Sequence, residues 1–236
     1  MIKILNIKYL LRHYLSLKLI FEYFKYLLVF FFLFYHIKNI NNNFSTKLKK
    51  GRNFTKDWFS RNIYFWLTLF KKENLLEKKI KILEIGTYEG FSAVFILSIL
   101  KNSHLTIVDT FKGGPEQKGV SSFSNLKKKF NKNLKKYKKR TFVHEESSDS
   151  FFQINKNKFD LIYIDGAHDY KSVLNDSVNS FKCLRQNGLL IFDDYFWRFY
   201  EDGKNPISAI NYFLKKNKKK FKIEFLTTQL AIKKIA

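Results

Sequence analysis

The chain has 236 residues, of which 44 are Lys or Arg and 20 are Asp or Glu, so its formal charge is +24. Apolar residues make up 45% of the sequence, which is enough for a substantial core and argues against a disordered chain. The single cysteine, Cys183, excludes a disulfide framework and a cysteine-based zinc site. Only six basic residues are Arg, the side chain that usually reads phosphates and bases, so we interpret the charge as a diffuse lysine background rather than a nucleic-acid surface.

The first 56 residues differ in character from the rest of the chain. An apolar stretch from Tyr14 to Tyr35 is interrupted by Lys18, Glu22 and Lys25, which would share one helical face. Its uninterrupted part, residues 26–35, is about half of a membrane span. We expect this helical pattern to break at residues 39–43, where Asn is concentrated.

Two partners for this helical extension stay open. Residues 14–37 have an apolar face with Lys flanks, which fits a helix lying in the plane of an anionic membrane surface. The alternative is a helix that packs on the following domain or on a second copy of the chain in a homo-oligomer. The location we expect is the cytoplasm, peripherally at the inner face of the membrane.

Residues 57–236 alternate between short apolar runs and helix-length stretches. The runs are typical of strands buried on both faces and cover 81–86, 105–109, 141–145, 159–165 and 188–193. The helical stretches cover 91–101, 122–137, 149–155 and 170–184. This alternation predicts a parallel sheet with helices on both faces. A last helix from Asn205-Pro206 to about Lys216 precedes two strands, 222–228 and 229–235, whose short connection requires an antiparallel hairpin.

The few acidic residues gather where the predicted strands end. The first strand runs into Glu84-Ile-Gly86-Thr-Tyr88-Glu89-Gly90, in which glycines allow a tight turn and the close approach of a ligand. The G-x-G-x-x-G fingerprint of dinucleotide-binding proteins is absent, which disfavours a nicotinamide enzyme. Asp109 ends the second strand, at a separation that suits an acid bound to a ribose hydroxyl.

Two later segments, Tyr163-Ile-Asp165-Gly-Ala-His168 and Leu189-Leu-Ile-Phe-Asp193-Asp194, complete the pattern. The chain from about 57 to 236 resembles class I S-adenosylmethionine-dependent methyltransferases, in particular the group of macrocin-type sugar and catechol-type O-methyltransferases (methyltransferase family 24). The resemblance implies an α/β, doubly wound, Rossmann-like sheet of seven strands in the order 3-2-1-4-5-7-6, with strand 7 antiparallel. It also implies S-adenosylmethionine as the cofactor and a small molecule or glycan precursor as the acceptor.

The resemblance assigns the cofactor contacts residue by residue. It places Glu84, Gly86, Tyr88 and Gly90 at the methionine end of the cofactor and Asp109 at the ribose. It places Ser147 or Ser148 near the adenine. The alternatives are structural: an ordinary strand-to-helix turn for the two glycines, and helix caps for Asp109 and the two serines.

A second set of residues is expected to carry the chemistry. In the fold that the resemblance implies, strands 4 and 5 are neighbours, so we expect the carboxylates of Asp165, Asp193 and Asp194 to converge. They would repel one another unless a cation such as Mg²⁺ compensates. Asp194 stands where catechol-type enzymes have Asn. His168 stands where they have a catalytic Lys, so we expect it to act with Asp165 as the general base. The alternatives are that His168 hydrogen-bonds a carboxylate or itself binds the metal. Asp169 and Asp176 are expected at a helix start and on a helix surface.

Two segments flank the predicted site, the loop 111–119 and the aromatic run 195–200, and loops at these strand ends usually recognise the substrate. The aromatic run would stack on a sugar or ring, or form core. Two other functions stay open. One is an RNA methyltransferase that uses the lysine surface, and the other is a non-catalytic membrane-associated protein that retains the fold.

Overall fold

The computed structural model describes residues 16–114 and 125–236. It divides into two compact units, one of residues 35–159 and one that combines the chain up to Phe34 with residues 160–236. The sequence predicts an extension of residues 1–56 followed by a domain of residues 57–236. That boundary stays a prediction, and each unit is described in turn.

Three parallel strands form the sheet of the unit 35–159: β1 (Lys81–Ile85), β2 (His104–Val108) and β3 (Thr141–His144). In their register Leu83 pairs with Thr106, which pairs with Phe142. The helices of this unit are α3 (Ile63–Lys72), α4 (Phe91–Ile99), α5 (Leu126–Leu134) and α6 (Ser148–Ile154), with 3₁₀ turns η1 (Ser60–Asn62) and η4 (Lys135–Arg140). Helix α4 is apolar all round and is buried along most of its length, as expected for a helix packed on a sheet.

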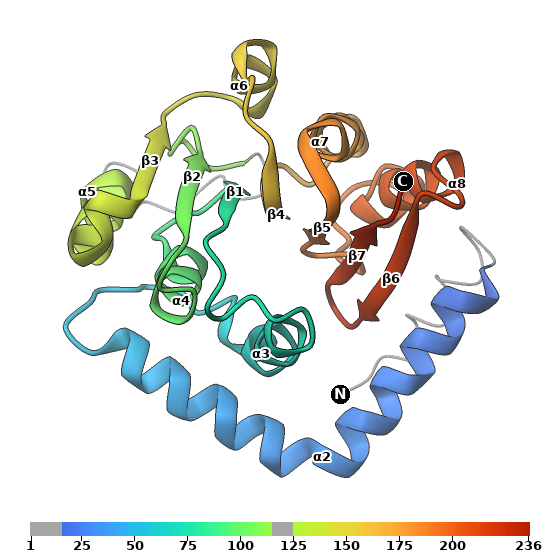
Figure 1. The fold of residues 1–236 in the computed structure, drawn as a ribbon, viewed down its shortest axis with the longest axis horizontal. Coiled ribbons are helices and arrows are strands. Elements are labelled where there is room, and N and C mark those ends of the chain that lie inside the picture. The colour runs from blue at the N-terminus through green and yellow to red at the C-terminus, as the bar shows by residue number, and fades with distance from the viewer. Residues whose placement is uncertain (1–15, 115–124) are drawn as a thin grey trace. The chain divides into compact units, whose positions relative to one another are not determined.

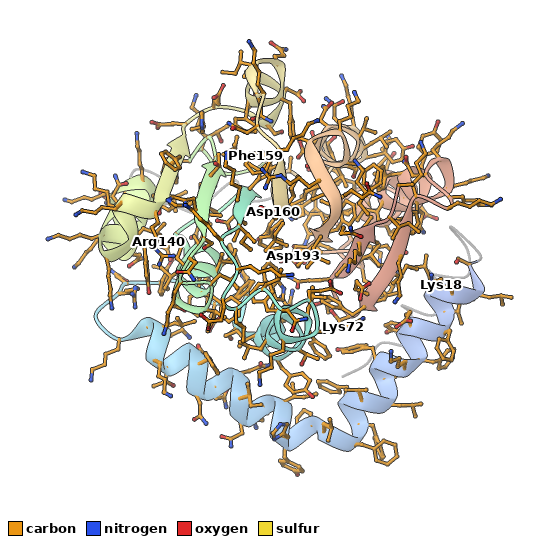
Figure 2. The ribbon with its side chains drawn as sticks, viewed as in Figure 1. Lys18, Lys72, Arg140, Phe159, Asp160 and Asp193 are labelled. Carbon is orange, nitrogen blue, oxygen red and sulfur yellow. The ribbon has the colours of Figure 1, made fainter. Side chains whose placement is uncertain are left out.

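Strand β3 departs from the prediction of a strand buried on both faces. Phe142 and Val143 are exposed, because β3 ends the strand order and has a neighbour on one side only. Arg140, just before this strand, donates to three carbonyl groups around the end of α4: those of Leu97, Leu100 and Ser103 (Figure 2 labels Arg140). The guanidinium therefore satisfies carbonyl oxygens that have no partner within the helix.

The unit that contains residues 160–236 holds the C-terminal strands, drawn in orange to red in Figure 1. Strand β7 (Leu230–Lys234) lies antiparallel between β5 (Leu184–Phe192) and β6 (Phe221–Leu226), which confirms the predicted hairpin. Helices α7 (Tyr170–Cys183) and α8 (Pro206–Lys216) begin at the predicted residues. Strand β4 (Phe159–Ile164) precedes α7, and its apolar residues are fully buried.

Over the described residues the sheet has seven strands in the order β3-β2-β1-β4-β5-β7-β6. This order confirms the predicted α/β fold, including the antiparallel position of strand 7. The strand boundaries agree to within a residue or two except for β5, which begins at Leu184 instead of Gly188.

The N-terminal helix, α2 (Leu17–Lys49), is longer than expected, and the predicted break at Asn39–Asn43 is wrong. Asn41 donates to the carbonyl of Arg61 and accepts from the backbone N–H of Tyr64. Asn43 donates to the side chain of Asn39. These side chains are thus engaged elsewhere and do not compete with the helix backbone.

The helix is interrupted at Leu33 instead, where φ −110° and ψ 16° leave the helical region and two helical segments meet at a kink. None of the helices in the described part of the chain is long and apolar enough to cross a membrane.

Candidate functional site

The turn between β1 and α4 has three residues in the left-handed region of backbone space. Gly86 has φ 77°, Tyr88 φ 53° and Gly90 φ 82°. For Tyr88 this conformation costs about 1–3 kcal/mol, a strain that is typical of functional sites. Two backbone hydrogen bonds hold the turn in place. The N–H of Gly86 donates to the carbonyl of Val108, and the N–H of Gly90 donates to the carbonyl of Thr87.

Gly90 is required for packing. A Cβ at this position would lie 2.4 Å from Cδ1 of Leu134 and 3.0 Å from Cδ2 of Phe130, both on α5. Its missing side chain therefore makes room for α5, and only its backbone remains available to a ligand. The predicted role of Gly90 in cofactor binding is thus limited to main-chain contact.

Asp109 follows β2, and its carboxylate links the turn after β1 to the loop after β2 by hydrogen bonds. Its Oδ2 accepts from the N–H groups of Thr87 (2.7 Å) and Tyr88 (3.0 Å), and its Oδ1 accepts from that of Phe111 (2.7 Å). A carboxylate has about four acceptor positions, so roughly one remains for a ribose hydroxyl. Its predicted contact with the ribose is compatible with this arrangement but stays a prediction.

Glu84 lies fully buried beneath the same turn. Its carboxyl group accepts from the hydroxyl of Thr87 at 3.0 Å and from that of Ser92. Burial raises the pKa of Glu84 to about 8, even though both hydroxyl groups lower it. The carboxyl group is therefore hydrogen-bonded within the protein and is mostly neutral at pH 7.

Sequence reasoning gave no role to Glu89, yet it anchors the turn. Its carboxylate accepts from the backbone N–H of Thr55 at 2.5 Å and from the Thr55 hydroxyl at 2.7 Å, and it pairs with Lys129 at 3.0 Å. The side chain is almost completely buried. The sequence contains a signal for this anchoring role, because acidic residues are few in the chain and Glu89 lies inside the motif that contains Gly86 and Gly90. The ring of Tyr88 packs against that of Trp58 in a tilted arrangement, with 4.9 Å between centroids and 40° between the ring planes.

Ser147 is the N-cap of α6, because its hydroxyl accepts from the N–H of Ser150. Ser148 is the first residue of that helix. The capping alternative therefore describes Ser147 in this structure, and the contact of either serine with adenine stays a prediction. Part of the loop 111–119, which is predicted to flank the site, lies outside the described residues, namely 115–119. The same is true of residues 122–124 of the predicted helix 122–137.

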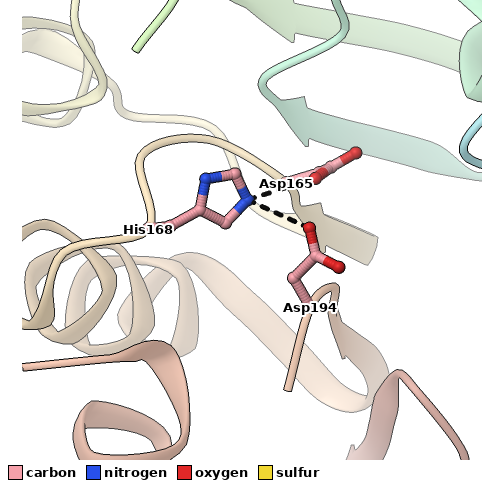
Figure 3. A group of neighbouring side chains, drawn as sticks. All are labelled: Asp165, His168 and Asp194. Atoms are coloured by element: carbon pink, nitrogen blue, oxygen red, sulfur yellow. Dashed lines mark ion pairs between the residues drawn. The ribbon is translucent and has the colours of Figure 1, made fainter. Parts of the chain in front are cut away.

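The second group of functional residues belongs to the unit that contains residues 160–236. Figure 3 shows His168 pointing toward two carboxylates, with its Nε2 3.2 Å from Oδ2 of Asp194 and 4.0 Å from Oδ1 of Asp165. One ligand atom from each of the three residues lies within 4.8 Å of the others. All three are half-buried, and Asp194 has a left-handed backbone with φ 49°.

Local structure places these side chains. Asp165 directly follows β4, and His168 stands just before Asp169, which caps α7 by accepting from the N–H groups of Lys171 and Ser172. Asp194 begins a turn closed by the N–H of Trp197. The helix-start role of Asp169 is confirmed, whereas Asp176, which was expected on a helix surface, is buried in α7.

Asp193 lies outside this group of three, and its predicted role as a metal ligand stays a prediction. Its Oδ2 accepts from the hydroxyl of Tyr163 and from Nε2 of Gln229 (2.9 Å), and its Oδ1 accepts from the N–H of Asp194. The hydroxyl of Tyr163 also donates to Asp165, at 3.1 Å. Burial, and then the charge of Asp194, raise the pKa of Asp193 to about 6. In this structure the carboxylate of Asp193 is engaged in buried hydrogen bonds, whereas His168 lies within the group of three candidate ligands.

An aromatic surface adjoins the group of Asp165, His168 and Asp194. The ring of Trp197 lies 4.7 Å from that of His168 and is stacked on Phe199 at 5.6 Å. Phe199 is exposed, whereas Tyr195 is buried and donates its hydroxyl to Asn211. Tyr195 therefore belongs to the core, as one of the two alternatives had it, whereas the stacking of Trp197 or Phe199 on an acceptor stays a prediction.

Comparison with known proteins identifies the class. Residues 83–195 match the protein family described as "Methyltransferase domain". The chain is 27% identical over 172 residues to Uncharacterized protein R132 of Acanthamoeba polyphaga mimivirus, covering 69% of this chain and 73% of the relative.

Among solved structures, the fold is similar to a putative caffeoyl-CoA O-methyltransferase from Staphylococcus aureus, with a TM-score of 0.54 and 19% identity, covering 90% of this chain and 98% of that one. It is also similar to a putative rRNA-methylase from Clostridium thermocellum (TM-score 0.55, 10% identity, 72% and 97% covered). A third similar structure is the MycE methyltransferase of the mycinamycin biosynthetic pathway in complex with Mg, S-adenosylhomocysteine and mycinamycin VI (TM-score 0.57, 12% identity, 83% and 54% covered).

The strand order and the two sets of acidic residues define a class I methyltransferase fold. Residues 83–195 match a methyltransferase domain, and this match together with the shared fold identifies the protein as a methyltransferase of the S-adenosylmethionine-dependent class.

Proposed function

We propose that this protein is an O-methyltransferase that transfers a methyl group from S-adenosylmethionine to the hydroxyl group of a small molecule or sugar, with a divalent cation at Asp165, His168 and Asp194. One observation carries the proposal: two carboxylates and an imidazole converge at the ends of β4 and β5 in a methyltransferase fold. The similar MycE methyltransferase, whose structure contains Mg, supports the same assignment.

The donor atoms fit a divalent cation. Two carboxylate oxygens and a ring nitrogen lie within 4.8 Å of one another, and oxygen donors suit Mg²⁺ or Mn²⁺ while imidazole also suits transition metals. Asp193, Tyr163 and Gln229 form a hydrogen-bonded support behind the group. Such supporting bonds orient the ligands of metal sites in general. The ion would contribute positive charge that lowers the pKa of an acceptor hydroxyl and fixes its oxygen.

His168 serves to hold the ion in this proposal, which differs from the predicted general base. Its Nε2 faces both carboxylates, and a neutral imidazole has only one ring nitrogen that can accept a proton or bind an ion. Bound S-adenosylmethionine would supply the methyl group to the acceptor oxygen, and the electron pair of the C–S bond would stay on sulfur. The proton of the hydroxyl passes to Asp165, whose side chain is more exposed than that of Asp194.

The turn after β1 is the proposed cofactor cradle. It combines the main chain of Gly86 and Gly90, the strained Tyr88 and the one remaining acceptor position of Asp109. Bound S-adenosylmethionine would supply a methyl group that its sulfonium has already activated, so the protein contributes mainly positioning. Trp197 and Phe199 would then orient the acceptor, since a stacked aromatic surface suits the face of a sugar or an aromatic ring.

An Asp194→Ala variant, which removes the donor oxygen altogether, tests the cation site, with Asp202→Ala, which removes an exposed carboxylate of the same unit, as the matched control. We expect Asp194→Ala to weaken Mn²⁺ binding, followed by electron paramagnetic resonance, by about 10- to 100-fold and to lower turnover on a panel of hydroxylated sugars and phenols. Affinity for S-adenosylhomocysteine should stay within about twofold. Mn²⁺ binding that is equal in both variants would remove the cation from the proposal. Methyl transfer to RNA, with none to any small acceptor, would remove the proposed acceptor class.

A further inference from the structure

The first segment of α2, Leu17–Phe34, is apolar on two opposite sides. On one side Leu19 and Tyr23 are buried, and the ring of Tyr23 packs against Phe196 at 5.1 Å between centroids. Both residues belong to the same compact unit as Phe196. This side of the helix is therefore already covered by its own domain.

The other side carries an exposed row of large apolar side chains, which we call the apolar stripe of α2. Its members are Leu17, Phe21, Phe24, Leu28, Phe31 and Phe32. The separations of three and four residues along this series place them on one helical face. Exposed fractions are 65% for Phe21 and 76% for Phe31, values that are high for side chains of this size.

The stripe is large enough to require an explanation. An aromatic side chain presents about 150–250 Å² when fully exposed, so six half- to four-fifths-exposed large side chains present on the order of 700 Å² of apolar surface. The largest patch on a typical monomer is about 300–600 Å² and is often functional. A helix that is apolar on both sides is normally covered on both.

Charged residues on α2 favour a lipid surface as the cover. Lys18 (labelled in Figure 2) and Lys25 are exposed beside the stripe, whereas the carboxylate of Glu22 is mostly buried and lies 3.7 Å from Lys25. In the sequence before the helix, Lys3, Lys8 and Arg12 add basic charge and residues 1–15 contain no acid. Phe and Leu beside Lys are typical of helices in the plane of a membrane interface.

The same charges disfavour a second copy of the chain. Each copy has a formal charge of +24, and a net charge far from zero opposes self-association, whereas an anionic surface attracts each nearby Lys or Arg. We propose that the apolar stripe of α2 binds the interface of an anionic lipid membrane, with the helix lying parallel to the surface and the domain on its cytoplasm-facing side.

The test uses the full chain and sedimentation with phosphatidylcholine vesicles, with or without phosphatidylglycerol. We expect the protein to bind the anionic vesicles. A Phe21→Ser/Phe31→Ser variant should bind about 100-fold more weakly, because losing each Phe side chain that the lipid would bury lowers the affinity roughly tenfold or more. The matched control is Phe142→Ser/Ile154→Ser, which removes two similarly exposed apolar side chains outside α2.

Depth measurement tests the proposal without removing the stripe. A spin label on Leu28→Cys reports immersion directly, because the native Cys183 is buried. On anionic vesicles the label should be accessible to oxygen and protected from a water-soluble relaxation agent. A label that stays in water, or vesicle binding that is equal for the stripe variant and the control, would overturn the proposal. So would a dimer in lipid-free solution, measured by analytical ultracentrifugation, that becomes monomeric only in the stripe variant.

Discussion

The buried acid beneath the cofactor turn gives the sharpest prediction for stability. Replacing Glu84 by Gln preserves size, and the hydroxyl groups of Thr87 and Ser92 can rotate to serve the amide as donor and acceptor. The wild-type protein carries a carboxyl group whose pKa rises from 4.5 to about 8 on folding. Between these values the folded state binds more protons than the unfolded state, so stability falls as the pH rises.

The size of this effect follows from the difference in pKa. At 1.36 kcal/mol per pH unit, the wild-type protein should lose about 3 kcal/mol by pH 7 and about 5 kcal/mol above pH 8, relative to a pH below 4.5. Urea unfolding of wild type and Glu84→Gln between pH 5 and 9 measures the difference. We expect the variant to become the more stable of the two as pH rises.

Glu201→Gln is the control, since Glu201 is fully exposed and pairs only with Lys204 at the surface. It should leave the pH profile of stability unchanged. Parallel pH profiles for the wild type and Glu84→Gln would refute the reasoning, because they would mean that Glu84 is ionised in the folded protein at neutral pH.

Two further predictions concern the packing that holds the site. Gly90→Ala should lower the free energy of unfolding in urea by about 2–4 kcal/mol, because its Cβ would lie 2.4 Å from Leu134 and its φ is 82°. The control is Gly203→Ala, where φ is 87° but the surrounding space is open. It should cost about 1 kcal/mol, from the backbone conformation alone. Arg140→Ala should cost about 2–3 kcal/mol, because three carbonyl groups lose a charged donor, while Lys139→Ala, an exposed neighbour, should change stability by less than about 0.5 kcal/mol. Equal losses within either pair would contradict the structural explanation.

Sequence patterns predicted the fold well because strand periodicity and strand-end acids are local signals. The order of the strands came from the resemblance, and the structure confirms it. The sequence does not predict the full length of α2, because the Asn-rich segment Asn39–Asn43 is typical of a helix break. In the structure the side chain of Asn41 instead forms hydrogen bonds with distant partners, the carbonyl of Arg61 and the N–H of Tyr64. Only tertiary contacts could reveal that.

The candidate site shows the same limit. The sequence placed Asp165, His168 and Asp194 at the correct strand ends, but it could not distinguish Asp193, which turns into the interior, from Asp194, which turns toward His168. Two features separate these adjacent residues. Asp194 has a left-handed φ, and Asp193 accepts a hydrogen bond from Gln229, which is 36 residues away along the chain. The burial of Glu89 depends in the same way on Thr55 and Lys129, which no local pattern indicates.

Titration calorimetry with S-adenosylhomocysteine, with and without Mg²⁺, tests the central claim most directly. The account predicts binding in both conditions, because the proposed cofactor contacts come from the turn after β1 and from Asp109, and Mg²⁺-dependent methyl transfer to a hydroxylated acceptor in a parallel assay. The absence of binding heat in both conditions, across a range of temperatures, would contradict the assignment of this protein as an S-adenosylmethionine-dependent methyltransferase.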